Sequence, residues 1–461
     1  MILAIGAAAG GGYWSHREEV RFRAEIGQAE KDLQAGRLAS ARDRLKAMVS
    51  RRPADGEAWY QLGRCELARQ RPDEALKAWE HVPEGSPFGV KATVERGRIM
   101  IDAGRFAEAE DLLERQPRGA GKDAERVRGL LELLYRFEGR TEDLRAEILR
   151  GWGHTDDPAA HLRRHYGVDL STYPAEMVGK IFAAAPPSDD RVWLGRAYLA
   201  RSMGRLDEAA RLLQDCRKKR PEDRAVWRES LALAQARGDA GGVWEAMEHL
   251  PSSALTEADR IRLRVWFAAQ AQDRAAEAAA LHALVDEAPG DTAAWDRLGE
   301  LALLKHDDEA AADLRKRKYE INVLRGRYRK VIDYPDRTGV ARELAWLASE
   351  LGRKAEHRGW TLIAEGLVEK ESLLPAEENS TTTLAAALPD LKPQESAKSL
   401  TPNVLSRVPV FVDDAERAGI GFVYDNGHSS KRPPPPEAMG GGVGLLDYDD
   451  DGWLDIYVVQ G

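Results

Sequence analysis

The stretch that decides the fold is DGEAWYQLGRCELARQRPDEALKAWEHVP, residues 55–83. It places W-x-x-L-G at Trp59, Leu62 and Gly63, followed by the small residue Ala75 and the large Trp79. A small residue lets two helices approach closely, and large side chains fill the space between neighbouring helix pairs. This stretch therefore predicts two antiparallel helices that pack against further copies of themselves.

The same pattern recurs along the chain with a period of 34 residues. A first array repeats the small position and the apolar position that follows it, at Ala41, Ala75 and Ala109 and at Leu45, Trp79 and Leu113. Prolines close successive units at Pro53 and Pro87. A second array is marked by Trp193, Trp227, Ile261 and Trp295. Self-similarity at such a period indicates a solenoid of stacked units.

This period resembles the tetratricopeptide repeat over about residues 22–325. The resemblance implies a mainly α-helical chain, built as a right-handed α-solenoid of helix pairs. We expect a first array at residues 22–119, an irregular helical region at 120–189, a second array at 190–325 and a helical cap at 326–370. Glu277 occupies a position that is normally small and apolar. The unit at about residues 258–290 is therefore expected to be the least regular.

The same resemblance implies a groove that holds a protein or peptide ligand. In tetratricopeptide solenoids the first helix of each pair lines the concave face, and its fifth and ninth positions point inward. Here those positions hold aromatic and arginine residues, namely Tyr60, Arg64, Arg98, Tyr198, Arg228, Arg262 and Trp266. A guanidinium can bind a carboxylate through two hydrogen bonds, which suits an extended peptide that carries carboxylates. The alternative is that these residues form a solvated face without a ligand.

The C-terminal residues contain D-x-D-x-D-G-x-x-D, the most specific chemical motif of the chain. Asp447, Asp449 and Asp451 can converge on one calcium ion where Gly452 turns the backbone. The carbonyl of Trp453 and the carboxylate of Asp455 complete the predicted ligand set. The flanking residues favour strands, so the motif is expected in a β-hairpin. An Asp-rich turn without a metal is the alternative.

Residues 409–461 resemble the beginning of an FG-GAP/VCBS repeat of the ASPIC/UnbV (cartilage acidic protein-like) family. That resemblance implies a calcium-binding β-propeller, in which the four Asp residues take the metal-ligand roles. Only the first hairpin of a blade is present, so we expect that the chain is truncated at its C-terminus. Residues 371–408 are rich in Ser, Thr, Pro, Glu and Lys and are predicted to be a disordered linker.

The N-terminal residues 1–21 contain an apolar run from Ile2 to Ala9. This run is shorter than the ~20 apolar residues that span a bilayer. It is interpreted either as the remnant of a signal or membrane anchor, or as a disordered terminus. A calcium site of this type is filled outside the cytoplasm, so we expect an extracytoplasmic location, whether secreted, periplasmic or membrane-anchored.

Composition limits the remaining function classes. The formal net charge of −9 argues against a nucleic-acid binder, because neutralising phosphates needs a basic face.

Cys65 and Cys216 have no metal or redox spacing and are predicted to be buried thiols. His161 and His165 are four residues apart, but neighbouring arginines favour solvated histidines on a helix surface over a zinc site.

The sequence shows no catalytic constellation. It lacks G-x-S-x-G and H-E-x-x-H, and no cysteine has a plausible histidine partner. The sequence therefore predicts a non-enzymatic scaffold for protein–protein interaction, joined to a calcium-binding propeller segment. Two alternatives are a recruitment module of a larger enzyme whose catalytic part lies outside this chain, and a cytosolic scaffold with an empty Asp loop.

Overall fold

The structure is a computed structural model of the chain. It describes residues 2–117, 119, 121–169, 174–334, 339–368, 372–374, 382–393, 443–446 and 455–458. The chain divides into two compact units, Met1–Ser399 and Leu400–Gly461, which are described separately.

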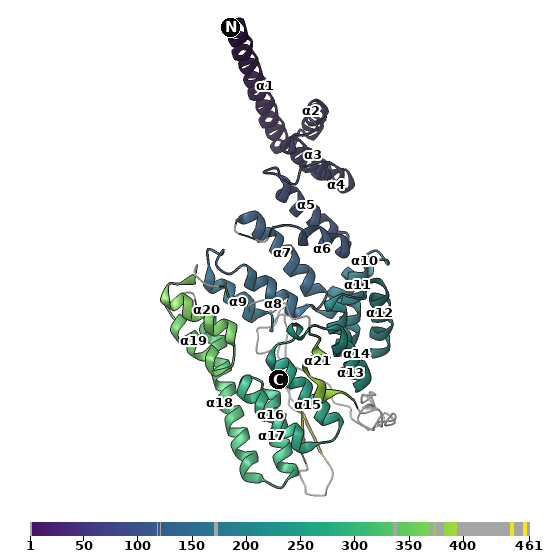
Figure 1. Cartoon of the computed structure of the whole chain (residues 1–461), viewed down its shortest axis with the longest axis vertical. Helices are drawn as coiled ribbons and strands as arrows, with labels where there is room; N and C mark the ends of the chain where they lie inside the picture. Colours follow the sequence, from purple (N-terminus) through teal and green to yellow (C-terminus); the bar gives the residue numbers. More distant parts are fainter. Residues whose placement is uncertain are drawn as a thin grey trace. The chain divides into compact units, whose positions relative to one another are not determined.

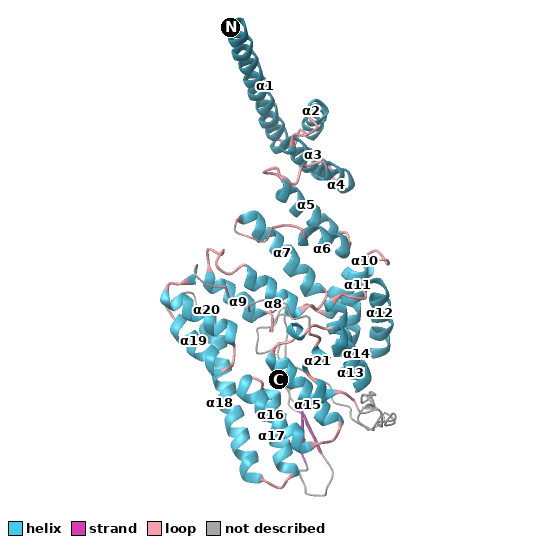
Figure 2. Ribbon diagram, viewed as in Figure 1, coloured by secondary structure: helices cyan, strands magenta, loops and turns pink. Residues whose placement is uncertain are grey.

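The first unit is a solenoid of antiparallel helix pairs (Figures 1 and 2). Its first three pairs are α1 (Ile2–Gln34) with α2 (Leu38–Arg51), α3 (Gly56–Ala68) with α4 (Pro72–Glu80), and α5 (Gly89–Asp102) with α6 (Phe106–Glu114). A later series consists of α11 (Asp190–Ser202) with α12 (Leu206–Lys219), α13 (Arg224–Arg237) with α14 (Ala240–His249), α15 (Glu257–Gln270) with α16 (Arg274–Glu287), and α17 (Thr292–Leu304) with α18 (Asp308–Ile332).

The periodic residues pack as their pattern predicts. Ala75 and Trp79 are almost fully buried. A Cβ atom on Gly63 would lie 2.2 Å from Nε1 of Trp79, so the glycine of W-x-x-L-G makes room for the indole of the second helix. The first-helix tryptophans also share one hydrogen bond, in which the indole N–H donates to the carbonyl of a proline six residues earlier; the pairs are Trp59–Pro53, Trp193–Pro187, Trp227–Pro221 and Trp295–Pro289.

The turn inside each pair contains one residue with a left-handed backbone. These residues are Gly36, Gln70, Gly104, Gly139, Gly204, Gly238, Gln272 and His306. They lie 34 residues apart from Gly36 to Gly104 and again from Gly204 to His306. This marker is hidden in the sequence because Gln and His occupy three of the positions.

Gly139 shows that the predicted irregular region begins with a regular pair. It follows Gly104 by 35 residues and joins α7 (Lys122–Phe137) to α8 (Thr141–Arg150). One additional residue therefore hid a further pair from the 34-residue period. Only α9 (Pro158–Gly167) and α10 (Ala175–Ala184) depart from the pairing. The interpretation of residues 120–189 as one irregular region was too broad.

The cap consists of α19 (Ala341–Glu350), α20 (Lys354–Glu365) and the end of α18, which runs through the predicted boundary at residue 326. These helices share a hydrophobic core with α8 and α9, built around Leu149, Trp152, Leu162, Tyr328, Leu344 and Trp360. Within it, the indole N–H of Trp360 donates to the Tyr328 hydroxyl at 2.9 Å. The cap therefore packs against the middle of the chain.

The unit that contains Glu277 is regular, contrary to expectation. Its helices α15 and α16 run for 14 residues each without a break. Glu277 is buried, and Nε of Arg297 on α17 donates to its carboxylate at 2.7 Å. A buried carboxylate is tolerated where a guanidinium pairs with it. The prediction of irregularity was wrong because the neighbouring unit supplies that partner.

The predicted disordered linker contains an ordered segment. Residues 382–393 include α21 (Leu384–Ala387) and the 3₁₀ turn η3 (Pro389–Leu391), and Leu384 is fully buried. Leu373 is buried as well. Residues 371–408 are polar on average, but they contain short apolar stretches that pack against the solenoid helices. Prediction of disorder was therefore wrong for this part.

Helix α1 runs without interruption through the predicted boundary at residue 21. Within the described residues, no helix is both long enough and apolar enough to cross a bilayer.

The described part of the second unit is a pair of antiparallel strands. These are β1 (Val443–Leu446) and β2 (Asp455–Val458), with Val443 opposite Val458 and Leu446 opposite Asp455. Asp455 thus lies in β2. The other predicted calcium ligands, Asp447, Asp449, Asp451 and Trp453, lie outside the described residues.

Candidate functional site

Three of the predicted groove residues lie on the first helices of the first array. Tyr60 on α3 is partly buried, and its ring centroid lies 5.3 Å from that of Phe88. Arg64 is exposed and donates from Nη1 to the side-chain carbonyl of Gln61 at 3.0 Å. Arg98 on α5 pairs with Glu95 at 2.8 Å, and 53% of its side chain is exposed. These two arginines are accessible to a partner.

Charges from three successive first helices act on Tyr60. Burial raises the pKa of Tyr60, and the charge of Glu95 acts in the same direction, whereas Arg64 and Arg126 lower it. Arg126 lies on α7, and 60% of its side chain is exposed. Arg126 was not predicted, because the 34-residue phase is lost after residue 119; the turn glycine Gly139 is the sequence signal that identifies its helix pair.

Tyr198 and Arg228, the predicted groove residues of α11 and α13, are covered by the turn between α7 and α8. A Cβ atom on Gly139 would lie 2.2 Å from Cγ of Tyr198, so the ring lies directly against the glycine. Nη1 of Arg228 lies 3.0 Å from Oδ1 of Asp143, at the start of α8. Both side chains therefore hold two parts of the solenoid together.

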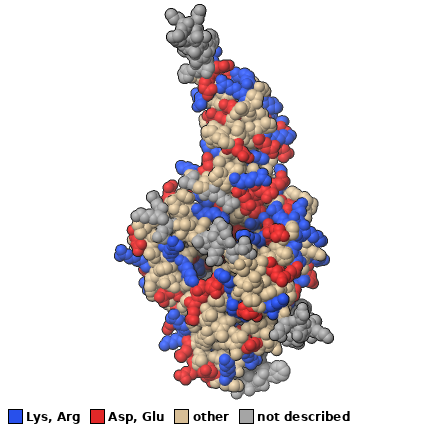
Figure 3. Space-filling model, in the orientation of Figure 1, with Lys and Arg blue, Asp and Glu red and all other residues tan. Residues whose placement is uncertain are grey.

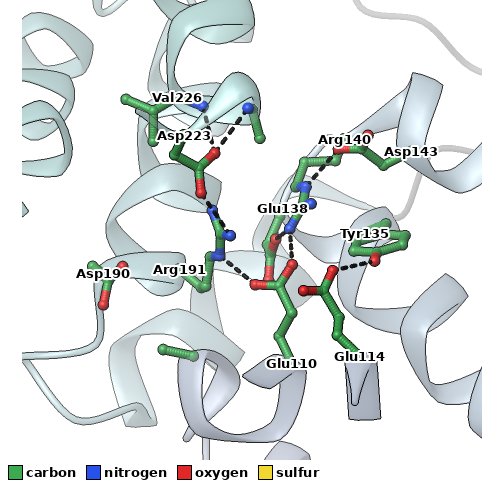
Figure 4. Close-up of polar contacts among 12 residues, drawn as sticks. Glu110, Glu114, Tyr135, Glu138, Arg140, Asp143, Asp190, Arg191, Asp223 and Val226 are labelled. Atoms are coloured by element: carbon green, nitrogen blue, oxygen red, sulfur yellow. Dashed lines mark hydrogen bonds and ion pairs between the residues drawn. The ribbon is translucent and has the colours of Figure 1, made fainter. Parts of the chain in front are cut away.

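Beside this turn, six charged residues form what we call the junction cluster, namely Glu110, Glu138, Arg140, Asp143, Arg191 and Asp223 (Figure 4). Arg140 pairs with Glu138 at 3.0 Å and with Asp143 at 2.8 Å. Arg191 on α11 pairs with Asp223 at 2.8 Å. Glu110 on α6 pairs with both arginines. The cluster thus connects the first array to the second.

Asp223 also explains where α13 begins. Its carboxylate accepts hydrogen bonds from the backbone N–H groups of Ala225 and Val226, at 2.8 and 3.2 Å. These N–H groups have no partner inside the helix, so a carboxylate at this position caps it. Asp223 therefore caps the N-terminus of α13 and also forms an ion pair with Arg191.

Burial controls the protonation of the cluster. It raises the pKa of Glu138 to about 8, and the negative charge of Glu110 adds to this effect while Arg140 opposes it. Burial alone would raise the pKa of Asp223 too, but Arg191 holds it below its ordinary value. The cluster therefore contains two carboxyl groups whose pKa values are shifted in opposite directions.

A pocket of about 140 Å³ lies beside the cluster, between residues 138–143, Leu194 of α11, and Ala225, Arg228 and Glu229 of α13. Sites for drug-sized ligands usually enclose about 300–1,000 Å³. The pocket is thus small for such a ligand, and we interpret this region as a junction between repeats.

Arg262 and Trp266, the last two predicted groove residues, lie on α15. Arg262 pairs with Asp259 at 2.7 Å and with Asp291 at 3.0 Å, and 45% of its side chain is exposed. Trp266 packs against a hydrophobic cluster that includes Leu384 and Leu388. The seven predicted residues therefore form three separate groups, in which Arg64, Arg98 and Arg262 are exposed, whereas Tyr198, Arg228 and Trp266 pack against other parts of the solenoid.

The histidines of α9 are buried, so the prediction of solvated side chains was wrong. Nε2 of His161 is hydrogen-bonded to the carbonyl of Ile148, and burial lowers the pKa of His161 to about 4. Nδ1 of His165 lies 3.2 Å from Glu356. Both histidines face the core shared with the cap. No group of three or more His, Cys, Asp or Glu residues in the described ranges is arranged to hold a metal ion.

The prediction of two buried thiols is confirmed for Cys65 and Cys216. Burial raises the pKa of Cys216 to about 12, which keeps this thiol protonated. A protonated, buried thiol is a poor nucleophile.

Surface charges of both signs are interspersed. On the face shown in Figure 3, lysine and arginine alternate with aspartate and glutamate instead of forming one basic area. This pattern favours short-range pairing over long-range attraction of a polyanion.

Two segments of the chain match models of the tetratricopeptide repeat, residues 32–88 and residues 190–236. The chain carries tetratricopeptide repeats. They fall in the two series of helix pairs described above.

A curated relative is Cellulose synthase operon protein C of Xanthomonas axonopodis pv. citri, which is 26% identical over 294 residues. The match covers 62% of this chain and 18% of the relative, so the chain spans less than a fifth of that protein's length.

Two solved structures with detectable similarity are named as tetratricopeptide repeat structures. The TPR domain of P58(IPK) is 16% identical, with coverage of 65% of this chain and 92% of that chain, at a TM-score of 0.23. A tetratricopeptide repeat protein from Parabacteroides merdae is 15% identical, with coverage of 71% and 98%, at a TM-score of 0.21.

Proposed function

We propose that this chain is a non-enzymatic scaffold that binds an extended, carboxylate-bearing segment of a partner protein on the first helices α3, α5 and α7. The observation that carries the proposal is that Arg64, Arg98 and Arg126 are exposed on these three helices, and that the charges of Arg64 and Arg126 both act on Tyr60. Tetratricopeptide solenoids use extended surfaces of this kind for binding.

The spacing of the helices indicates the type of partner. Packed helices lie about 8–10 Å apart, and a peptide in the extended polyproline II conformation advances about 3.1 Å per residue with three residues per turn, so every third side chain faces the same way. A carboxylate at every third residue therefore meets successive arginines. Arg64, Arg98 and Arg126 are exposed, and their internal partners are Gln61, Glu95 and Asp123, each within one turn of the same helix. Ion pairs of this kind on a helix contribute little, so a partner can replace those of Arg98 and Arg126.

The pairs α11–α12 and α13–α14 are weaker candidates for this partner. Their predicted arginine Arg228 is held by Asp143, and their Tyr198 lies against Gly139. A carboxylate that approached Arg228 would compete with a partly buried ion pair, whose rupture is costly.

A selection experiment tests the proposed function. A random peptide library displayed on phage is panned against the full chain, and we expect enrichment of peptides with Asp or Glu at every third position. Arg64→Ala/Arg98→Ala should abolish the enrichment. Arg211→Ala, an exposed arginine on α12, is the matched control and should retain it. Enrichment that is identical for all three proteins would contradict the proposal.

We also propose that Asp447, Asp449, Asp451 and Asp455, with the Trp453 carbonyl, bind one calcium ion. The antiparallel pairing of residues 443–446 with residues 455–458 supports this, because it makes residues 447–454 the connection between two strands. Calcium bound there would bring the carboxylates together and neutralise their repulsion.

An extracytoplasmic location, with residues 1–21 as the remnant of a signal or anchor, belongs to the same proposal, since extracellular calcium sites work at about 10⁻⁴–10⁻³ M. Fractionation of cells that express the chain with its natural upstream sequence tests the location. Recovery in the cytosolic fraction alone would contradict it.

A further inference from the structure

Residues 382–391 lie on the second series of helix pairs, although they follow the cap in sequence. The N–H of Ser252 donates to the carbonyl of Thr382 at 2.9 Å, and the N–H of Leu384 donates to the carbonyl of Leu250 at 2.7 Å. Thr383 and Pro251 thus form an antiparallel bridge. The segment adds one extended residue to the connection between α14 and α15.

The next residues bury apolar side chains in the same place. Leu384, Ala385 and Leu388 are between 0% and 6% exposed. They join a hydrophobic cluster from α13, α14 and α15 that includes Trp227, Met247, Leu250 and Leu263, with Trp266 packed against it. The hydroxyl of Thr383 accepts the N–H of Ala386 at 3.3 Å and caps the short helix. Asp390 pairs with Arg264 at 3.3 Å.

These contacts are of the kind that hold a peptide ligand. Main-chain hydrogen bonds at an exposed backbone edge supply affinity, and apolar anchors in pockets supply selectivity. Leu384 and Leu388, four residues apart, are the anchors here. The pairs α13–α14 and α15–α16 are complete helix pairs without the segment. The segment therefore behaves as an occupant of the surface.

We propose that Leu250–Ala254, α14 and α15 form a second docking surface, and that residues 382–391 are its resident occupant. The partner is a segment of another protein with the same chemistry: one extended residue, a hydroxyl-capped helical turn and two leucines four residues apart. This proposal goes beyond the acidic-peptide face on α3, α5 and α7, because it uses different helices and apolar contacts.

The resident segment lowers the apparent affinity of the surface for such a partner, because the two compete for the same site. A segment that belongs to the same chain as its site is present there at an effective concentration on the order of millimolar. A free partner segment competes with that concentration. Removal of the resident segment from the surface should therefore increase the apparent affinity of a partner segment by at least about tenfold.

The test uses a fluorescein-labelled peptide of residues 382–393, TTLAAALPDLKP. Its binding is measured by anisotropy to the parent chain and to the full-length variant Leu384→Asp/Leu388→Asp, whose own segment no longer fits the surface. We expect the variant to bind the probe at least tenfold more tightly than the parent does. A probe with the same two leucines replaced by aspartate should bind neither protein. Equal, weak binding by a variant with unchanged helical circular dichroism would overturn the proposal.

A second measurement on the parent chain decides the matter if the variant does not fold. Hydrogen exchange is followed at the Leu384 amide of the chain while unlabelled probe is added in excess. Displacement of the resident segment predicts faster exchange at this amide, and unchanged protection at saturating probe would overturn the proposal.

Light scattering tests whether a second copy of the chain is the occupant instead. A dimer in which Leu384 stays protected would mean that a second copy fills the surface, and would also overturn the proposal.

Discussion

Arg191 on α11 and Glu110 on α6 form an ion pair between residues 81 positions apart, and their side chains are only 5% and 1% exposed. The pair brings the first array against the second without relying on the repeat period. Because both charges are buried, each depends on the other and on the rest of the junction cluster. The solenoid is therefore held together at this point by specific charge pairing.

Removal of one member of this pair should destabilise the chain strongly. Arg191→Met leaves Glu110 and Asp223 without their shared partner, and we expect a loss of about 3–5 kcal/mol in the free energy of unfolding. Urea denaturation followed by circular dichroism measures it. Arg205→Met removes an exposed pair with Glu208 and should cost less than about 1 kcal/mol. Similar losses for both variants would show that the cluster is not the structural junction.

Glu138 should make stability depend on pH. Because its pKa rises from 4.5 in the unfolded chain to about 8 in the folded chain, the folded state retains a proton that the unfolded state releases between these values. The contribution of this group to stability is therefore largest below about pH 4.5 and decreases as pH rises to about 8. Urea midpoints at several pH values measure the slope. Glu138→Gln should flatten it between pH 5 and 8, and an unchanged slope would contradict the assignment.

Gly139 should not tolerate a side chain. Its φ is +72°, and a Cβ atom would overlap the ring of Tyr198. We expect Gly139→Ala to cost at least about 2 kcal/mol, from backbone strain and displacement of the ring. The control is Gly129→Ala, an exposed position within α7 with open space around it. That substitution should stabilise the chain by about 0.5–1 kcal/mol. Thermal unfolding compares the two, and a neutral Gly139→Ala would show that the turn is not constrained.

Calcium binding is tested by calorimetry on the full chain. We expect one calcium ion per chain, and weaker binding of magnesium, which demands a stricter octahedral arrangement of oxygen ligands. Asp449→Ala and Asp451→Ala should each abolish the heat of calcium binding. Glu378→Ala, outside the motif, controls for nonspecific binding to acidic residues. Equal calcium binding by the parent and both aspartate variants would contradict the ligand assignment.

The sequence predicted the helix pairs because their packing is local. Ala75 and Trp79 recur at a fixed spacing, and each contacts its own or the adjacent unit. The turn at Gly139 escaped prediction because one additional residue shifts its phase. The partners of Arg191 and Leu384 could not be predicted, because each lies far away in sequence and no periodic rule connects them.

The sequence could not separate exposed from covered groove residues, because the covering contacts come from parts of the chain that are distant in sequence. The fifth and ninth positions of a first helix are defined by the helix itself, whereas their exposure depends on distant segments. Asp143 covers Arg228, and residues 382–391 cover Trp266, while Arg64 is exposed. The sequence identified candidate positions, and the fold decides which of them a partner can reach.

The most direct test of the scaffold function is a titration of the full chain with a fluorescein-labelled peptide that carries glutamate at every third position. We predict saturable binding that weakens at least tenfold in Arg64→Ala/Arg98→Ala and is unchanged in Arg211→Ala. The affinity should also fall as salt is added, because the contacts are between exposed charges. Binding of equal strength to all three proteins, or no binding at low salt, would contradict the proposed function.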